Sequence, residues 1–178
     1  MTTRRTITAF ASAACAALLT AAVAVAAGDE GSTAVAAHAT AKFHVLATAR
    51  QAGYGLLKDK QGISCIAMDS MPAMGAMGVH YAKPALVGDG KLKATTPEAL
   101  VYAPQGKTLR LAAVEYVVLK ADWDKRHATA PVLFGHSFNF TPAGNRFGLP
   151  AYYSLHVWLF RHNAAGTFAM WNPGVHCP

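Results

Sequence analysis

Residues 99–119, ALVYAPQGKTLRLAAVEYVVL, carry the clearest strand pattern in the chain. Two runs rich in aliphatic, aromatic and β-branched residues, 99–103 and 109–119, are typical of strands. The tetrapeptide PQGK at 104–107 lies between them and is typical of a turn. We therefore predict two antiparallel strands joined as a β-hairpin.

Other segments extend this hairpin into a larger sheet. Short strands are predicted at 63–67 and around 79–81, and a longer one at 152–161 (YYSLHVWLFR). The best helix candidate is 41–57, where apolar residues recur at three- and four-residue spacing, while 121–150 is predicted to be irregular. The pattern predicts an α+β fold, a mainly antiparallel sheet with one N-terminal helix packed on it. An all-β barrel or sandwich is the alternative.

The first residues are typical of an export signal. Residues 1–26 combine a basic pair, Arg4 and Arg5, with an apolar stretch and the small-residue motif Ala24-Val25-Ala26 that signal peptidase accepts. An uncleaved anchor is disfavoured because the alanine-rich stretch is weakly hydrophobic. We predict a signal peptide at 1–26, a flexible lead-in at 27–41 and one globular domain at 42–178. The mature protein is then secreted or extracytoplasmic at the cell envelope, by either the Sec or the twin-arginine route.

Charge and composition limit the partners. The 178-residue chain has a formal net charge of +7, but its Lys and Arg residues are scattered singly. No basic run or nucleic-acid-binding signature is present, so no nucleic-acid partner is expected. Outside the leader no stretch is long enough for a stable transmembrane span. Anionic cell-envelope polymers are a possible class of partner, and the pattern does not predict an oligomeric state.

Two cysteines remain once the leader is removed, Cys65 and Cys177. In an exported protein two cysteines most often pair, so we predict a Cys65–Cys177 disulfide. The alternatives are a reactive thiol or a metal site that includes His176 and Cys177.

Residues 68–80, MDSMPAMGAMGVH, place a potential ligand at every third position. Thioethers favour Cu(I), and imidazole binds copper in both oxidation states. Pro and Gly disfavour a regular helix, and an extended polyproline-like backbone would place these side chains along one edge. This pattern predicts a copper site. Its alternative is that the methionines fill gaps in the core. The ligand candidates are Met68, Met71, Met74, Met77 and His80.

A second constellation contains candidate catalytic residues. Strand alternation in 109–119 makes Glu115 the only acidic residue on an otherwise apolar face, and in 152–161 it places His156 on one face with aromatic residues. If both converge with His80, the set would hold a divalent metal with open coordination positions or act as an acid/base pair. The alternative is a structural role, with Glu115 exposed or paired with Arg110 or a histidine. No other catalytic motif is present.

Four blocks of the chain resemble segments of known proteins. They are MGVHYAKPALV at 77–87, PEALVYAP at 97–104, LRLAAVEYVV at 109–118 and the tract 155–177. The chain resembles small exported bacterial proteins, mainly actinobacterial, that are described only as hypothetical or uncharacterised. The resemblance implies a single domain, and it implies no activity, cofactor or site residue.

Three functions therefore remain open on the sequence. The first is an exported domain that binds copper through the Met-rich loop. The second is an extracytoplasmic enzyme that uses the Glu/His cluster. The third is a disulfide-closed envelope interaction domain without catalysis.

Overall fold

The computed structural model describes Met1, residues 28–68 and residues 70–178; the predicted signal peptide, apart from Met1, lies outside these residues. A seven-stranded sheet dominates, with the order β1-β3-β4-β5-β9-β8 and with β2 also paired to β3. Every pairing in it is antiparallel. The predicted α+β class is confirmed, and the sheet does not close into a barrel. Its strands are β1 (Gly55–Leu56), β2 (Cys65–Ala67), β3 (Ala76–Ala82), β4 (Ala99–Gln105), β5 (Thr108–Leu119), β8 (Asn139–Thr141) and β9 (Tyr152–Val157).

The predicted hairpin is confirmed and forms the centre of this sheet. β4 and β5 pair from Ala99↔Glu115 to Gln105↔Thr108. Gly106 has φ of +57°, a left-handed conformation that glycine adopts without steric cost, and it closes the turn. The segment 121–150 is not wholly irregular, because it contains the small sheet of β6 (Val132–Leu133) and β7 (His136–Ser137) as well as β8.

The helices are short, and the predicted helix at 41–57 is interrupted. A 3₁₀ turn, η1 (Ala41–His44), is separated from α2 (Leu46–Gln51) by Val45, whose backbone is extended. The helix stops before Gly53, where φ is +90°. The remaining helical elements are α1 (Gly28–Thr40), η2 (Pro72–Met74), α3 (Pro84–Val87) and α4 (Lys120–Asp124).

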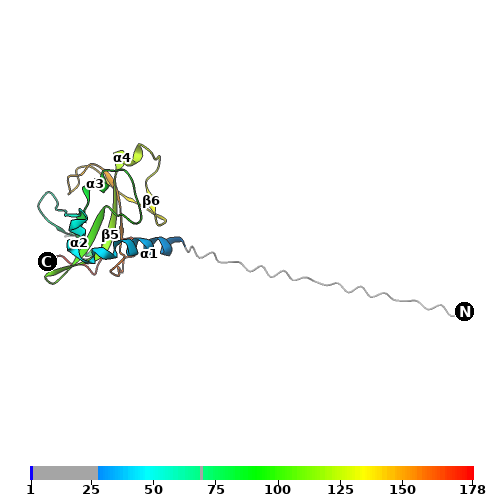
Figure 1. Cartoon of the computed structure of the whole chain (residues 1–178), viewed down its shortest axis with the longest axis horizontal. Coiled ribbons are helices and arrows are strands. Elements are labelled where there is room, and N and C mark those ends of the chain that lie inside the picture. Colours follow the sequence, from blue (N-terminus) through cyan, green and yellow to red (C-terminus); the bar gives the residue numbers. More distant parts are fainter. Residues whose placement is uncertain (2–27, 69) are drawn as a thin grey trace.

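Residues 27–41 contain α1 where the sequence pattern predicts a flexible lead-in. Ala36 is fully buried in the core, and the Thr40 hydroxyl donates to the Ala36 carbonyl at 2.7 Å. α1 consists mainly of small and polar residues and has no strong apolar face. Contact with the core therefore accounts for the helix. Figure 1 shows α1 and α2 at one end of the molecule and α3 and α4 at the other.

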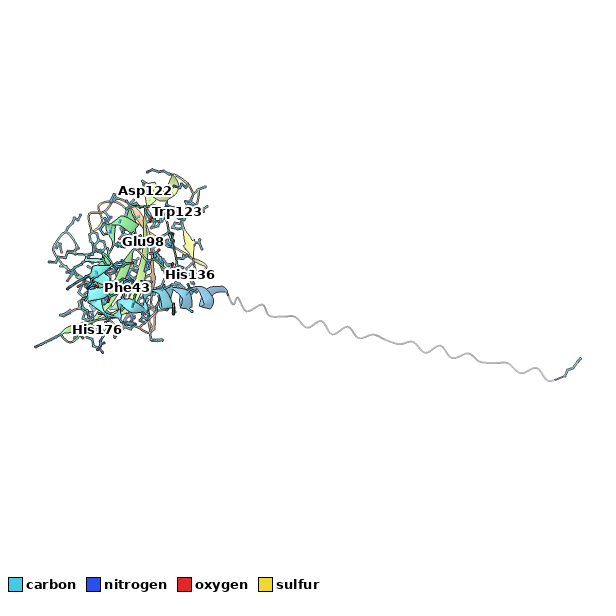
Figure 2. All side chains as sticks on the ribbon, viewed as in Figure 1. Phe43, Glu98, Asp122, Trp123, His136 and His176 are labelled. Atoms are coloured by element: carbon cyan, nitrogen blue, oxygen red, sulfur yellow. A yellow bond between two sulfur atoms is a disulfide. The ribbon has the colours of Figure 1, made fainter. Side chains whose placement is uncertain are left out.

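One face of the sheet carries the main hydrophobic core. Phe43, Ala49 and Tyr54, from the helical N-terminal region, pack against the strands. The Tyr102 hydroxyl donates to the carbonyl of Phe43, the latter labelled in Figure 2, at 2.8 Å. The buried strand residues in this core are Val79, Tyr81, Leu100, Tyr102, Leu111, Val114, Tyr116, Val118, Tyr153, Leu155 and Val157.

The opposite face is covered by the C-terminal segment. Trp158 and Val175 pack there against Val101 and Ala113 in a second, smaller core. The predicted Cys65–Cys177 disulfide is confirmed, with the two Cα atoms 5.6 Å apart. It ties this segment to β2 and leaves no thiolate for the alternative metal site at Cys177.

Gly75 sets how closely the C-terminal segment approaches β3. Its φ is +71°, and a Cβ there would lie 2.1 Å from the carbonyl oxygen of Asn172. Ala76 and Asn172 form an isolated antiparallel bridge at this point. Glycine is therefore needed at position 75 for both its conformation and its size.

Glu98, which precedes β4 and is labelled in Figure 2, is buried, and its carboxylate accepts a hydrogen bond from the Val117 N–H at 3.0 Å. Burial raises its pKa from an ordinary 4.5 to about 8, against the opposing effect of the N–H donors. Between these two values the unfolded chain ionises while the folded one keeps its proton. The contribution of Glu98 to stability is thus most favourable below pH 4.5 and is lost as pH rises to about 8.

Glu98→Gln should remove this pH dependence. We expect the native chain to lose stability between pH 5 and pH 8.5, and Glu98→Gln not to lose it. The free energy of unfolding of Glu98→Gln minus that of the native chain should therefore increase by about a few kcal/mol over this range. Urea unfolding at both pH values measures the change. Asp124→Asn, which removes an exposed carboxylate, is the control. If the difference in the free energy of unfolding between Glu98→Gln and the native chain does not vary with pH, the raised pKa of Glu98 is contradicted.

Candidate metal centre

Three strands position the candidate site. His80 is on β3, Glu115 on β5 and His156 on β9. Glu115 and His156 are directly opposite each other in the ladder, so their side chains share a face. His80 is opposite Val101, which is opposite Ala113, two residues from Glu115; His80 therefore lies on that face as well.

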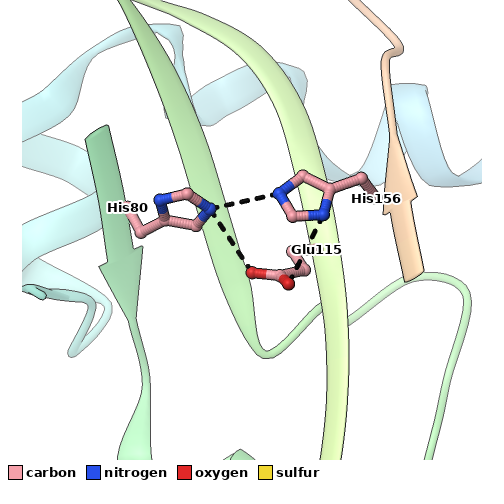
Figure 3. A group of neighbouring side chains, drawn as sticks. All are labelled: His80, Glu115 and His156. Atoms are coloured by element: carbon pink, nitrogen blue, oxygen red, sulfur yellow. Dashed lines mark hydrogen bonds and ion pairs between the residues drawn. The ribbon is translucent and has the colours of Figure 1, made fainter. Parts of the chain in front are cut away.

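β4 separates β3 from β5, so His80 and Glu115 must reach towards each other over it. Neighbouring strands are about 4.8 Å apart, which places these two backbones roughly twice that distance from one another. Ala99, opposite Glu115 on β4, has a side chain short enough to leave the space free. Figure 3 shows the three side chains converging. Glu115, His156 and His80 therefore converge, which is the condition that the sequence analysis set for this site.

The polar atoms of the cluster are close together. His80 Nε2 lies 3.2 Å from His156 Nε2 and 3.4 Å from Glu115 Oε2. His156 Nδ1 lies 3.4 Å from Glu115 Oε1. One ligand atom from each residue can be chosen so that all three lie within 4.8 Å of one another.

Burial keeps both imidazoles neutral at pH 7. It lowers the pKa of His80 to about 4, although the Glu115 carboxylate acts in the opposite direction. It lowers the pKa of His156 to about 3. Burial likewise raises the pKa of Glu115, although electrostatic interaction with His80 and a hydrogen bond with Ser154 act to lower it. Neutral imidazole is the form that binds a metal ion.

Two polar atoms of the cluster lack hydrogen bonds. His80 Nδ1 and His156 Nδ1 are both buried without a hydrogen-bond partner. Glu115 Oε1 lies 3.4 Å from His156 Nδ1, but these two atoms do not have hydrogen-bond geometry. The Gly78 backbone acts to raise the pKa of His80, but it makes no hydrogen bond of normal geometry with His80 Nδ1. Buried polar atoms are rarely left in this state. The two rings are therefore buried without satisfying all of their hydrogen-bonding capacity within the protein.

A cavity of about 560 Å³ opens onto the cluster. His80 and Glu115 line it, whereas His156, 1% exposed, lies behind them. Hydrogen-bonding groups from β8, from β9 and from the loop 142–151 that joins them surround the same space: Thr141, Asn145, Arg146, Tyr152 and Ser154.

The loop over this cavity is held by a small set of polar contacts. The Arg146 guanidinium donates to Asp59 Oδ2 at 2.8 Å through Nη2 and at 3.3 Å through Nε. These hydrogen bonds hold the pKa of the Asp59 carboxyl below its usual range. The Asn145 amide donates to the carbonyls of Pro142 and Leu149 and accepts from the N–H groups of Phe147 and Leu149. These contacts tie the loop to Asp59 and to its own backbone.

Sequence reasoning missed most of these surrounding residues. Strand alternation places Tyr152 and Ser154 on the same face as His156, but it does not mark either of them as a site residue. Asn145, Arg146 and Asp59 lie outside any periodic segment, so no pattern marks them.

The Met-rich segment is only partly gathered at the site. Met68 and Met77 line the cavity together with His80, and Met170 joins them. Met71 is 49% exposed, and η2 replaces the expected extended backbone at Pro72–Met74. None of the four methionines at 68–77 is fully buried, so they do not form a core.

Comparison with protein-family models, with curated proteins and with solved structures finds no significant match for this chain. Functional inference therefore depends on the geometry of the site. In the part of the chain that the structure describes, no helix is long and apolar enough to cross a membrane.

Proposed function

We propose that this chain is an exported metal-binding domain that holds a divalent transition-metal ion through His80, Glu115 and His156. The observation that carries the proposal is the burial of these three ligands, from three separate strands, with their ligand atoms within 4.8 Å of one another. Two imidazoles and one carboxylate are a recognised ligand set for such ions, and they leave coordination positions open.

The spacing of the cluster is compatible with a shared ion, although His80 Nε2 and His156 Nε2 are also within hydrogen-bond distance of each other. Two ligand atoms each about 2.1 Å from a tetrahedral ion are about 3.4 Å apart. The two measured separations from His80 Nε2 are 3.2 Å and 3.4 Å. A buried carboxylate beside two neutral rings is unfavourable on its own, and a bound cation would compensate it.

The cavity indicates what the ion does. Since His80 and Glu115 face the cavity, open coordination positions are accessible to water or to a small ligand. A metal ion in such a site acts as a Lewis acid or lowers the pKa of a bound water. Arg146 and Ser154 would orient the exogenous ligand by hydrogen bonding, while Asn145 shapes the loop that presents Arg146. The enzymatic hypothesis and the metal-binding hypothesis thus coincide at one site.

Export forms part of this proposal. The composition of residues 1–26 is typical of a signal peptide, and the Cys65–Cys177 disulfide suits an oxidising compartment. We infer a secreted or cell-envelope location for the mature domain.

Metal titration of residues 28–178, produced with the disulfide formed, tests the proposal. We expect one equivalent of Zn(II), Cu(II), Fe(II) or Mn(II) per chain by elemental analysis. His156→Ala should weaken binding more than about 100-fold, because even residues behind the direct ligands cost 10- to 100-fold. His162→Ala, at an exposed histidine, is the matched control and should bind normally. Binding unaffected by His156→Ala would refute this site, and no binding at all would favour the interaction-domain hypothesis.

A second candidate, copper held with thioether ligands, is favoured by one observation. Met68 and Met77 line the same cavity as His80. If these sulfurs bind Cu(I), Met68→Leu and Met77→Leu should each weaken Cu(I) binding about tenfold or more while leaving Zn(II) binding unchanged. Met71→Leu, at the exposed methionine, is the control. Equal Cu(I) affinity in all three variants would exclude the thioether contribution.

A further inference from the structure

A second cavity, of about 260 Å³, adjoins the cluster on the other side of Glu115. Its lining is almost entirely apolar, and Glu115 is its one charged side chain among the described residues. The apolar side chains that line it include Val87, Val117, Leu119, Phe147 and Leu149. We call this space the apolar chamber.

Small residues on the sheet account for the chamber. Ala82 and Ala99 lie in one cross-strand row with Glu115 and His156. Larger side chains at these two positions would fill the space next to Glu115. The loop that Asn145 and Arg146 hold in place supplies Phe147, Leu149 and Pro150 from the other side.

The chamber adjoins the cavity at the metal centre and shares three lining residues with it. Glu115, Phe147 and Tyr152 line both. A ligand bound at an open position of the ion can therefore extend past Glu115 into an apolar environment. Small-molecule sites commonly combine a mainly apolar pocket with a few polar groups at one end.

Charge indicates the chemistry of the polar end. A divalent ion bound by one carboxylate and two histidines leaves a net positive charge, and the Arg146 guanidinium, which is paired with Asp59, adds hydrogen-bond donors to the same cavity. An anionic group would be favoured there, whereas a cationic one would be repelled.

We propose that the site binds a small amphipathic anion, with its carboxylate or equivalent acid group on the metal ion and its apolar chain in the chamber. This inference rests on the proposed metal-binding function. It names a ligand class and assigns the chamber-lining residues a role in chain-length specificity.

Binding of straight-chain alkanoates, from acetate to decanoate, to the Zn(II)-loaded protein tests the inference by calorimetry. Affinity should rise about fourfold for each added methylene until the chamber is full, and then stop rising. Val87→Trp, which fills the chamber, should weaken octanoate binding about tenfold or more and leave acetate binding unchanged. Val45→Trp, at a residue 60% exposed, is the matched control. Leu149→Trp fills the chamber from the loop and serves if Val87→Trp does not fold.

Metal content measured on the same samples separates the two proposals. If the protein binds Zn(II) but alkanoate affinity does not rise with chain length, or is unchanged in both Trp variants, the chamber inference is overturned. The proposed metal site would be unaffected by that result. No Zn(II) binding would overturn the proposed function, and the inference with it. A chain-length series that depends on Val87 and requires Zn(II) supports both.

Discussion

Glu115→Gln is expected to abolish stoichiometric metal binding and also to make the metal-free protein more stable at neutral pH. The loss of binding follows because an amide oxygen replaces the one anionic ligand, and we expect it to exceed about 100-fold. The gain in stability follows because burial raises the pKa of Glu115, so ionising it in the fold is unfavourable. We expect a gain of about 1–3 kcal/mol in the free energy of unfolding, measured by urea denaturation with chelator present.

Glu98→Gln is the matched control for this prediction. Glu98 is a buried carboxyl whose pKa is also raised, but it lies outside the cluster. It should share the stability gain and keep full metal affinity. A Glu115→Gln protein that is less stable than the native chain without metal would instead show that Glu115 is a structural partner of the histidines. The opposite signs of the two effects thus distinguish a ligand from a packing residue.

Removal of the disulfide by Cys65→Ser with Cys177→Ser should lower the free energy of unfolding by about 4–5 kcal/mol. The two cysteines are 112 residues apart, and a cross-link of that span strongly restricts the unfolded chain. Metal affinity should fall as well, because the segment that the disulfide holds supplies Met170 and Trp171 to the wall of the cavity.

The native protein treated with a reductant is the control for this variant. It should match the double variant in urea denaturation, whereas the double variant should not respond to the reductant. A loss of less than about 1 kcal/mol would show that the second core, formed by Trp158 and Val175, holds the C-terminal segment without the cross-link.

Much of the sheet follows from local pattern, because strand alternation has a period of two and the 104–107 turn fixes the hairpin. The same alternation is enough to assign Glu115 and His156 to defined strand faces. It does not place His80 beside them, because that depends on β3 lying next to β4, a long-range pairing without a local signal.

The features that sequence reasoning missed have tertiary causes. α1 forms although its composition suggests a flexible segment, since Ala36 is buried against the core. Val45 interrupts the predicted helix at 41–57. The loop of Asn145 and Arg146 is shaped by side-chain contacts with residues such as Asp59, 87 positions away, and no periodicity encodes those contacts.

The X-ray absorption spectrum of the Zn(II)-loaded protein tests the central claim most directly. Coordination by His80, Glu115 and His156 predicts imidazole nitrogens and carboxylate oxygen at about 2.0–2.2 Å, with the imidazole scattering reduced in His156→Ala. A spectrum dominated by sulfur at about 2.3 Å, or one that His156→Ala leaves unchanged, would contradict the account and place the ion elsewhere.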